Sequence, residues 1–132
     1  MSQALTVRDI AAAIEDFAPK SLQESYDNAG LQVGNPDATV SGILLCLDVT
    51  EDIVREAEER KCNLIVSHHP LLFKGLKEIT GATPAQRIVI EALRLGISIY
   101  SAHTNLDSAR EGVSYEIAHI LGLKSLSPLE PR

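Results

Sequence analysis

The chain lacks the patterns that mark membrane, secreted and nucleic-acid-binding proteins. No apolar run within its 132 residues approaches the about 18 residues of a membrane-spanning helix. The segment 1–10, "MSQALTVRDI", has neither the basic part nor the apolar part of a secretory signal, which predicts a cytoplasmic protein. The net charge is −6 and basic residues form no cluster, which disfavours nucleic acid as a partner.

Cysteine is also scarce. The chain has only two, Cys46 and Cys62, and each lies within or beside an apolar run. Both are predicted to be small buried hydrophobic residues in a reducing compartment, although the spacing alone leaves a disulfide open. A zinc site built mainly from thiolates is disfavoured, because the cysteines precede the ends of the predicted strands.

The residues that are present form alternating helix and strand patterns. Continuous apolar runs of strand length occupy residues 41–48, 63–67 and 97–101. Helices are predicted from Thr6 to Pro19, from Thr50 to Lys61, over 83–96 and over 112–122. Strands that are apolar on both faces and alternate with helices predict an α/β fold with three layers. Its sheet should be mostly parallel or mixed, with helices on both faces.

Length and composition indicate one ordinary domain. A chain of 132 residues with 45% hydrophobic residues can bury a core of its own. We expect the domain to cover residues 1–123 and the proline-containing segment 124–132 to be a linker.

Histidines gather where two of the predicted strands end. His68 and His69 follow one apolar run in "SHHP", and His103 follows another in "SAHTNLD" with Asp107 four residues later. Ligands bind to open α/β sheets at the carboxyl ends of the strands. Adjacent side chains on a strand face opposite ways, but Pro70 breaks the strand, so both imidazoles can turn toward one site.

Imidazole and carboxylate together suit Zn, Fe, Mn, Co or Ni. The alternative is that these histidines are ordinary hydrogen-bonded or exposed residues, and the residues alone leave a metal site and this reading about equally favoured. Asp48 also lies at a strand end, whereas His119 falls on the last predicted helix and is predicted to be a surface or boundary residue.

Three segments together resemble a known family. "DNAGLQVG" (27–34), "SHHPLLF" (67–73) and "SAHTNLD" (101–107), in this order and spacing, are similar to the GTP cyclohydrolase 1 type 2 homologues, also called the Nif-three-like dinuclear metal centre family. The family has a tryptophan where this chain has Tyr26. The resemblance covers residue 6 to the end of the chain.

The resemblance implies a site with two divalent metal ions. His68, His69 and Asp107 would be metal ligands, and His103 would lie in the same pocket as a general acid or base. Asp27 and Asn28 would shape the wall of the site or a turn.

Family members take two further ligands, a histidine and a glutamate, from a second half with a similar layout, and we find no matching segment after Asp107. We therefore expect a fragment with three of five ligands, which holds metal weakly or not at all without the rest. The family also implies self-association into a hexameric ring.

The predicted reaction is metal-dependent hydrolysis of a small-molecule substrate, a nucleotide or a cyclic amide. The family name implies opening of the guanine ring of GTP, but the chain has no Gly-rich phosphate loop. Lys74, Lys77 and Arg110 could hold phosphates or could be ordinary surface charge. The alternatives are a metal-binding scaffold or regulatory interaction protein without turnover, and a structural domain with incidental histidines.

Overall fold

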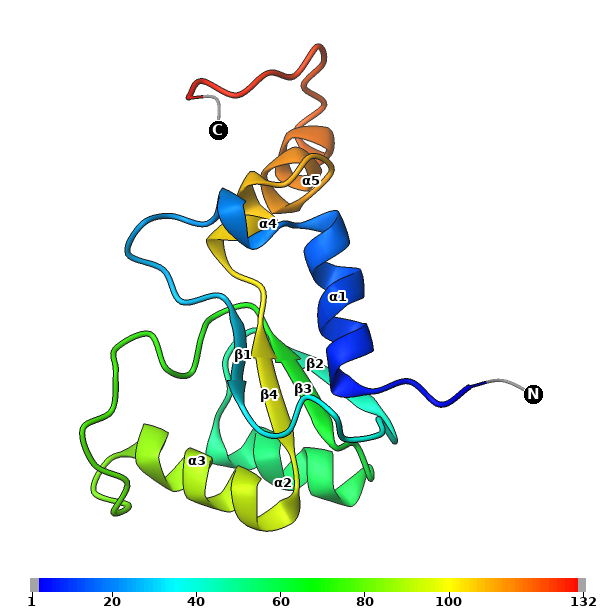
Figure 1. Ribbon diagram of the computed structural model, residues 1–132. Helices are drawn as coiled ribbons and strands as arrows, with labels where there is room; N and C mark the ends of the chain where they lie inside the picture. Colours follow the sequence, from blue (N-terminus) through cyan, green and yellow to red (C-terminus); the bar gives the residue numbers. More distant parts are fainter. Residues whose placement is uncertain (1–2, 131–132) are drawn as a thin grey trace.

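A four-stranded sheet in the order β1-β4-β3-β2 forms the centre of the computed structural model, which describes residues 3–130 (Figure 1). The strands β2 (Ile43–Cys46), β3 (Leu64–Ser67) and β4 (Ser98–Ser101) run parallel, as their apolar sequences predict. The fourth strand, β1 (Gly30–Val33), pairs antiparallel with β4 at one edge. The sheet is therefore mixed, which confirms the predicted fold class.

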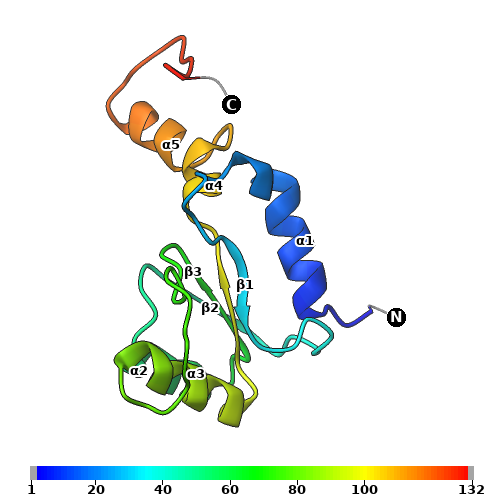
Figure 2. The ribbon, with the colours of Figure 1, turned by 60° about the vertical axis from the view of Figure 1, so that its left-hand side comes forward.

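Helices cover both faces of this sheet, as predicted. The helices α2 (Glu51–Glu59) and α3 (Pro84–Leu95) pack on one face, and α1 (Val7–Phe17) packs on the other (Figures 1 and 2). Along β4, Ile99 faces α2 and α3 while its neighbour Tyr100 faces α1, which is the alternation expected of a strand buried on both sides.

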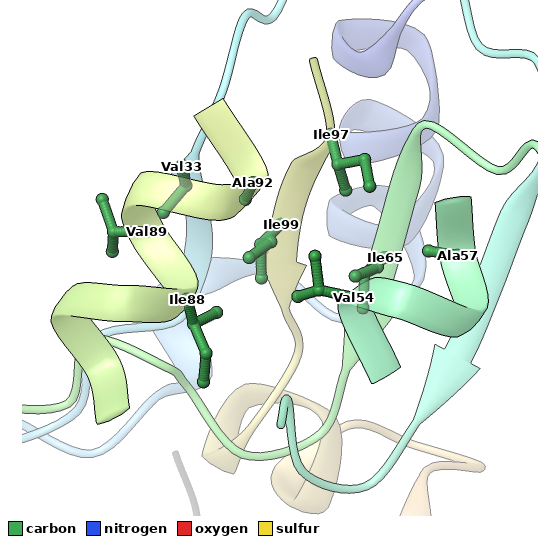
Figure 3. Packing of buried hydrophobic residues seen from close by; sticks show 9 residues of the cluster. All are labelled: Val33, Val54, Ala57, Ile65, Ile88, Val89, Ala92, Ile97 and Ile99. Atoms are coloured by element: carbon green, nitrogen blue, oxygen red, sulfur yellow. The ribbon is translucent and has the colours of Figure 1, made fainter. Parts of the chain in front are cut away.

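The larger part of the core lies between the sheet and the pair α2 and α3. Figure 3 shows Ile65 and Ile99 of the sheet directed toward these helices. The buried apolar residues of this cluster are Val33, Val54, Ala57, Ile65, Ile88, Val89, Ala92, Ile97 and Ile99. This packing fixes the two neighbouring strands β3 and β4, whose ends carry the histidines.

Threonines begin all three of these helices. The hydroxyl oxygens of Thr6, Thr50 and Thr83 each accept a hydrogen bond from a backbone N–H of the first turn. Gly96 ends α3 in the left-handed conformation, at φ 68°. The side chain of Gln86 does not bond back to Thr83; instead its oxygen accepts hydrogen bonds from the preceding turn, at residues 80 and 82.

The segment after β4 differs from the prediction. Residues 103–107 lie outside every predicted helix and strand, but the structure has a short helix, α4 (Thr104–Ser108), directly after His103. The last helix, α5 (Val113–Ile120), is shorter than the predicted range 112–122, and none of its residues is buried. His119 of α5 is exposed, in agreement with the prediction.

The cysteines agree with the prediction only in part. Cys46 and Cys62 are free thiols in the structure, but both are partly exposed rather than buried. Among residues 3–130, no helix combines the length and the apolar character that crossing a bilayer requires.

Candidate metal centre

Two parallel strands carry the histidines to the same edge of the sheet. Ser67 and Ser101 are register partners at the ends of β3 and β4, and the chain turns away from the sheet just after each of them. The backbone N–H of Ala102 still donates to the carbonyl of Ser67, at 3.0 Å. His68, His69 and His103 therefore emerge side by side, as the sequence predicts for residues at neighbouring strand ends.

The three imidazole rings lie close together, tilted or edge to face. Their centroids are 5.3 Å apart for His68 and His69, 5.2 Å for His68 and His103, and 5.4 Å for His69 and His103. One ring nitrogen from each histidine can be chosen so that all three lie within 4.8 Å of one another. We call these residues the imidazole triangle. The sequence predicts His68 and His69 as a pair with His103 nearby. In the structure the three rings are about equally far from one another.

Each ring of the triangle uses its Nδ1 atom to contact a fixed oxygen. The pairs are His68 with the carbonyl of Ala102 (2.8 Å), His69 with Oδ1 of Asp48 (2.8 Å) and His103 with Oδ1 of Asp27 (3.0 Å). A carbonyl or carboxylate oxygen only accepts, so each Nδ1 donates the hydrogen, and in the neutral form of such a ring Nε2 is the nitrogen with a free lone pair. Metal-binding histidines are oriented in this way, by an acceptor behind the ring.

Asp27 is the most enclosed of these acceptors, with its side chain 0% exposed. Its Oδ2 accepts a hydrogen bond from the backbone N–H of Thr104, at 3.0 Å, and a second one from the Thr104 hydroxyl. Burial by itself would raise the pKa of Asp27, but the hydrogen bonds from Thr104 and His103 outweigh it and lower the pKa to about 2. Asp27 is therefore a carboxylate throughout the neutral range, and it holds His103 and the start of α4 together.

The helix α4 returns Asp107 toward the triangle. Oδ1 of Asp107 lies 3.3 Å from Nε2 of His68. Two ligand atoms about 2.0–2.1 Å from one ion, at a tetrahedral angle, are separated by about 3.3 Å. The pair of His68 and Asp107 therefore fits a divalent transition metal in chemistry and in spacing, whereas among the described residues the group with all ligand atoms within 4.8 Å of one another consists of the three histidines and does not include Asp107.

Two polar side chains tie the strand β1 to the chain that follows the histidines. The amide group of Asn28 donates to the carbonyl of Leu72 at 2.8 Å, and the N–H of Leu72 donates to the side-chain oxygen of Gln32 at 3.1 Å. The sequence pattern alone does not identify Gln32 as part of this region, although a glutamine inside the apolar stretch 30–34 is a signal. The segments 27–34 and 67–73 thus both lie near the site, and hydrogen bonds join them.

An aromatic pair lies next to the triangle. The rings of Tyr26 and Phe73 meet edge to face, with centroids 6.3 Å apart at 69°. Phe73 also meets the ring of His103 nearly edge on, at 6.4 Å and 86°. Sequence analysis noted Tyr26 only as a departure from the family pattern, and it did not single out Phe73.

The basic residues considered for phosphate binding do not form one group. Lys74 and Lys77 lie exposed on the long connection between β3 and α3. Arg110 lines a cavity of about 630 Å³ between α4, α5 and the C-terminal segment, and Asp107 borders the same cavity. Arg110 is thus the basic residue of the three that shares a cavity with a member of the candidate site.

The chain is similar to several known proteins along nearly its whole length. A "GTP cyclohydrolase 1 type 2 homolog" from Clostridium acetobutylicum is 46% identical over 125 residues, which are 95% of this chain and 47% of that protein. A "NIF3-like protein 1" from Rattus norvegicus is 39% identical over 128 residues, 96% of this chain and 34% of that protein. The chain thus spans about half or less of these relatives.

Solved structures share the fold. A Bacillus cereus protein "related to NIF3" matches with a TM-score of 0.91 and 37% identity, over 99% of this chain and 36% of that one. Reduced HcgD from Methanocaldococcus jannaschii matches with a TM-score of 0.88 and 32% identity, over 98% of this chain and 52% of that one. A sequence model of the family described as Duf34/NIF3 (NGG1p interacting factor 3) covers residues 5–132. The chain belongs to the Duf34/NIF3 family.

Proposed function

We propose that His68, His69 and Asp107 are ligands of a divalent metal centre, and that this centre hydrolyses a small-molecule substrate. The observation that carries the proposal is the arrangement of the imidazole triangle. One ring nitrogen of each histidine lies within 4.8 Å of the other two, each Nδ1 contacts an oxygen behind its ring, and a carboxylate oxygen lies 3.3 Å from Nε2 of His68.

The complete centre of the proposal holds two ions of Zn, Fe, Mn, Co or Ni, with further ligands from outside this sequence. The resemblance implies a histidine and a glutamate in that role. This is consistent with the length of the C. acetobutylicum relative, of which the chain spans 47%.

A bound ion would polarise the substrate and activate a water molecule for attack. His103 is the group of this chain suited to moving a proton, because its ring lies beside those of His68 and His69 and its Nδ1 is held by Asp27, which leaves Nε2 for the transfer. The buried Asp27 carboxylate stabilises the imidazolium that forms when Nε2 takes up a proton. A nucleotide or a cyclic amide is the proposed substrate class, and the name of the bacterial relatives supports the nucleotide.

A metal-binding scaffold or regulatory interaction protein is the second candidate. The description of the family as an interacting factor favours it. A scaffold needs the metal ligands, but it has no use for a group that moves protons. The role of His103 therefore distinguishes the two candidates.

The metal is tested with Co²⁺, whose visible absorption reports imidazole coordination, on the 132-residue chain without a metal-affinity tag. Wild type and the His119→Ala variant should give the same titration, because His119 is exposed on α5, away from the triangle. His68→Ala and Asp107→Ala should each weaken binding at least about tenfold. Equal binding by His68→Ala and wild type would refute the metal centre.

The role of His103 is tested by comparing metal content with turnover on a panel of nucleotides and cyclic amides. His103→Ala should retain Co²⁺ and lose about 100-fold or more in hydrolysis rate. If this variant loses Co²⁺ as His68→Ala does, His103 is a ligand and the acid–base role is wrong. If turnover by the metal-loaded variant equals that of wild type, the catalytic assignment fails and the scaffold is favoured.

A further inference from the structure

Aromatic side chains are few in this chain, and two of them are placed in water beside the imidazole triangle. The sequence has two phenylalanines, three tyrosines and no tryptophan. Tyr26 is 65% exposed and Phe73 is 44% exposed, whereas Tyr100 is buried in the core. Rings of this size normally stabilise a fold by leaving water. The exposed pair contributes little stability by leaving water, so burial in the core does not account for its position.

The pair is held in place by hydrogen bonds rather than by close packing. Asn28 and Gln32 bind both backbone groups of Leu72, the residue before Phe73. On the other side, Asp27 follows Tyr26 directly and is anchored to His103 and Thr104. The position of each ring is therefore set by the chain next to it, and this positioning is complete before any ligand arrives.

The ring geometry leaves room for a third flat ring. Tyr26 and Phe73 meet at 69° and Phe73 and His103 meet at 86°, so these rings are not stacked in parallel on one another, and the exposure of Tyr26 and Phe73 leaves part of their surface open to water. A face that is open to water can stack on a flat conjugated ring, which is a contact that tolerates many ring types. The edge contact between Phe73 and His103 places such a ring within reach of the site.

We propose that Tyr26 and Phe73 form a stacking platform that binds a flat, conjugated ring of the substrate next to His103. This inference rests on the proposed function for its biological meaning, since it assigns the substrate of that centre a planar ring. The binding itself requires no metal. The platform consists of Tyr26 and Phe73, with Asn28 and Gln32 as positioning residues.

The test measures binding of guanosine 5′-monophosphate to the 132-residue chain in the presence of EDTA, followed by NMR of the aromatic side chains. Ribose 5-phosphate is the matched probe, because it keeps the sugar and the phosphate and lacks the ring. Wild type should bind the nucleotide saturably at millimolar concentrations, with shifts at Tyr26 and Phe73, and should bind ribose 5-phosphate at least about tenfold more weakly.

Substitution separates the platform from other contacts. Phe73→Leu and Tyr26→Leu should each weaken binding of the nucleotide about tenfold and leave ribose 5-phosphate unchanged. Phe17→Leu is the control: Phe17 is 53% exposed, and it meets no other ring among residues 3–130. Circular dichroism of each variant confirms that it is folded. Because two platform variants are measured, the test still applies if one of them does not fold.

Three outcomes would overturn the platform: no saturable binding of the nucleotide, equal binding of ribose 5-phosphate, or unchanged affinity in both folded platform variants. None of them bears on the metal, because EDTA is present throughout. Conversely, Co²⁺ binding that is unaffected by His68→Ala would refute the metal centre and leave the platform standing. The two failures are thus distinguishable.

Discussion

The carboxylate of Asp27 and the imidazole of His103 lie 76 residues apart in sequence and 3.0 Å apart in space. Asp27 occupies the turn before β1, and His103 follows β4, the antiparallel partner of β1. The same carboxylate binds the first residue of α4, the helix that carries Asp107. One buried side chain thus orients a histidine of the triangle and anchors the element that bears the nearby carboxylate.

The first prediction concerns acid stability. Because the pKa of Asp27 falls from 3.8 in the unfolded chain to about 2 in the fold, its contribution is fully present above pH 4. It is lost as the pH falls through this window, since the unfolded chain then binds the proton more readily. When the pH falls from 6 to 3, the unfolding free energy of wild type should therefore decrease by about 1 kcal/mol more than that of Asp27→Asn. Urea unfolding with EDTA measures the difference.

The control for this comparison is Asp37→Asn. Asp37 is an exposed carboxylate, paired with Arg8 on the surface. The variant should show the pH dependence of wild type. A dependence as shallow as that of Asp27→Asn would mean that the effect is not specific to the buried carboxylate.

A second prediction addresses the orientation of His69. Asp48→Asn leaves every proposed ligand in place but weakens the acceptor behind the His69 ring, which is 2.8 Å away. We expect Co²⁺ affinity to fall about 10-fold to 100-fold, as for other residues that orient a ligand from behind. Competition with a chromophoric chelator measures this, with Asp37→Asn again as the control. Unchanged affinity would show that Asp48 does not orient the ring.

A third prediction concerns the hydrogen bonds at Leu72. Removing the Gln32 side chain leaves the Leu72 N–H without its acceptor and loosens the connection from β3 to α3. Trypsin should then cleave after Lys74 several times faster in Gln32→Ala than in wild type. Mass spectrometry of the products locates the cut.

Asn63→Ala provides the matched control for proteolysis. Its side chain also bonds two backbone groups, at Thr39 and Ser41, but it lies at the other end of the sheet. Cleavage after Lys74 should stay slow in this variant. Equal acceleration in both variants would indicate general destabilisation rather than release of the connection.

A fourth prediction tests a glycine. Gly34 has φ +118°, and an added Cβ would lie 2.7 Å from the backbone Cα of Ser98 and closer still to its side chain. Gly34→Ala should cost about 3 kcal/mol from strain and overlap together. Gly75→Ala is the control, because no atom lies within 4 Å of its added Cβ. Thermal unfolding of the two variants should differ clearly, and equal midpoints would contradict the prediction.

Much of the fold could be read from local patterns. The three parallel strands are continuous apolar runs, and the three sheet-covering helices begin at capping threonines. The strand β1 was missed as a strand because its four residues are few and include Gln32. Its edge position depends on pairing with β4, which no local pattern records. The helix α4 was missed because five residues are too few to show a helical period.

The clustering of the three histidines could be predicted from the sequence, whereas the groups behind their rings could not. The strand ends of a parallel sheet bring His68, His69 and His103 together by topology alone. The acceptors behind the rings were not predictable in this way, because the contacts to Asp27 and to the carbonyl of Ala102 depend on tertiary packing. A carboxylate in a turn has many ordinary explanations, and only the fold shows that this one is buried against a histidine.

The pairing of β1 with β4 has a consequence for a chain that is still emerging from the ribosome. Gly30 is synthesised long before Ser101, its partner in the sheet, and Asp27 before His103. The strands β2 and β3 can pair with each other before β1 has its partner β4. When β4 pairs with β3, β1 gains its partner at the edge of the sheet, and His103 is placed beside His68 and His69 in the same step. The imidazole triangle is therefore assembled only when the sheet is complete.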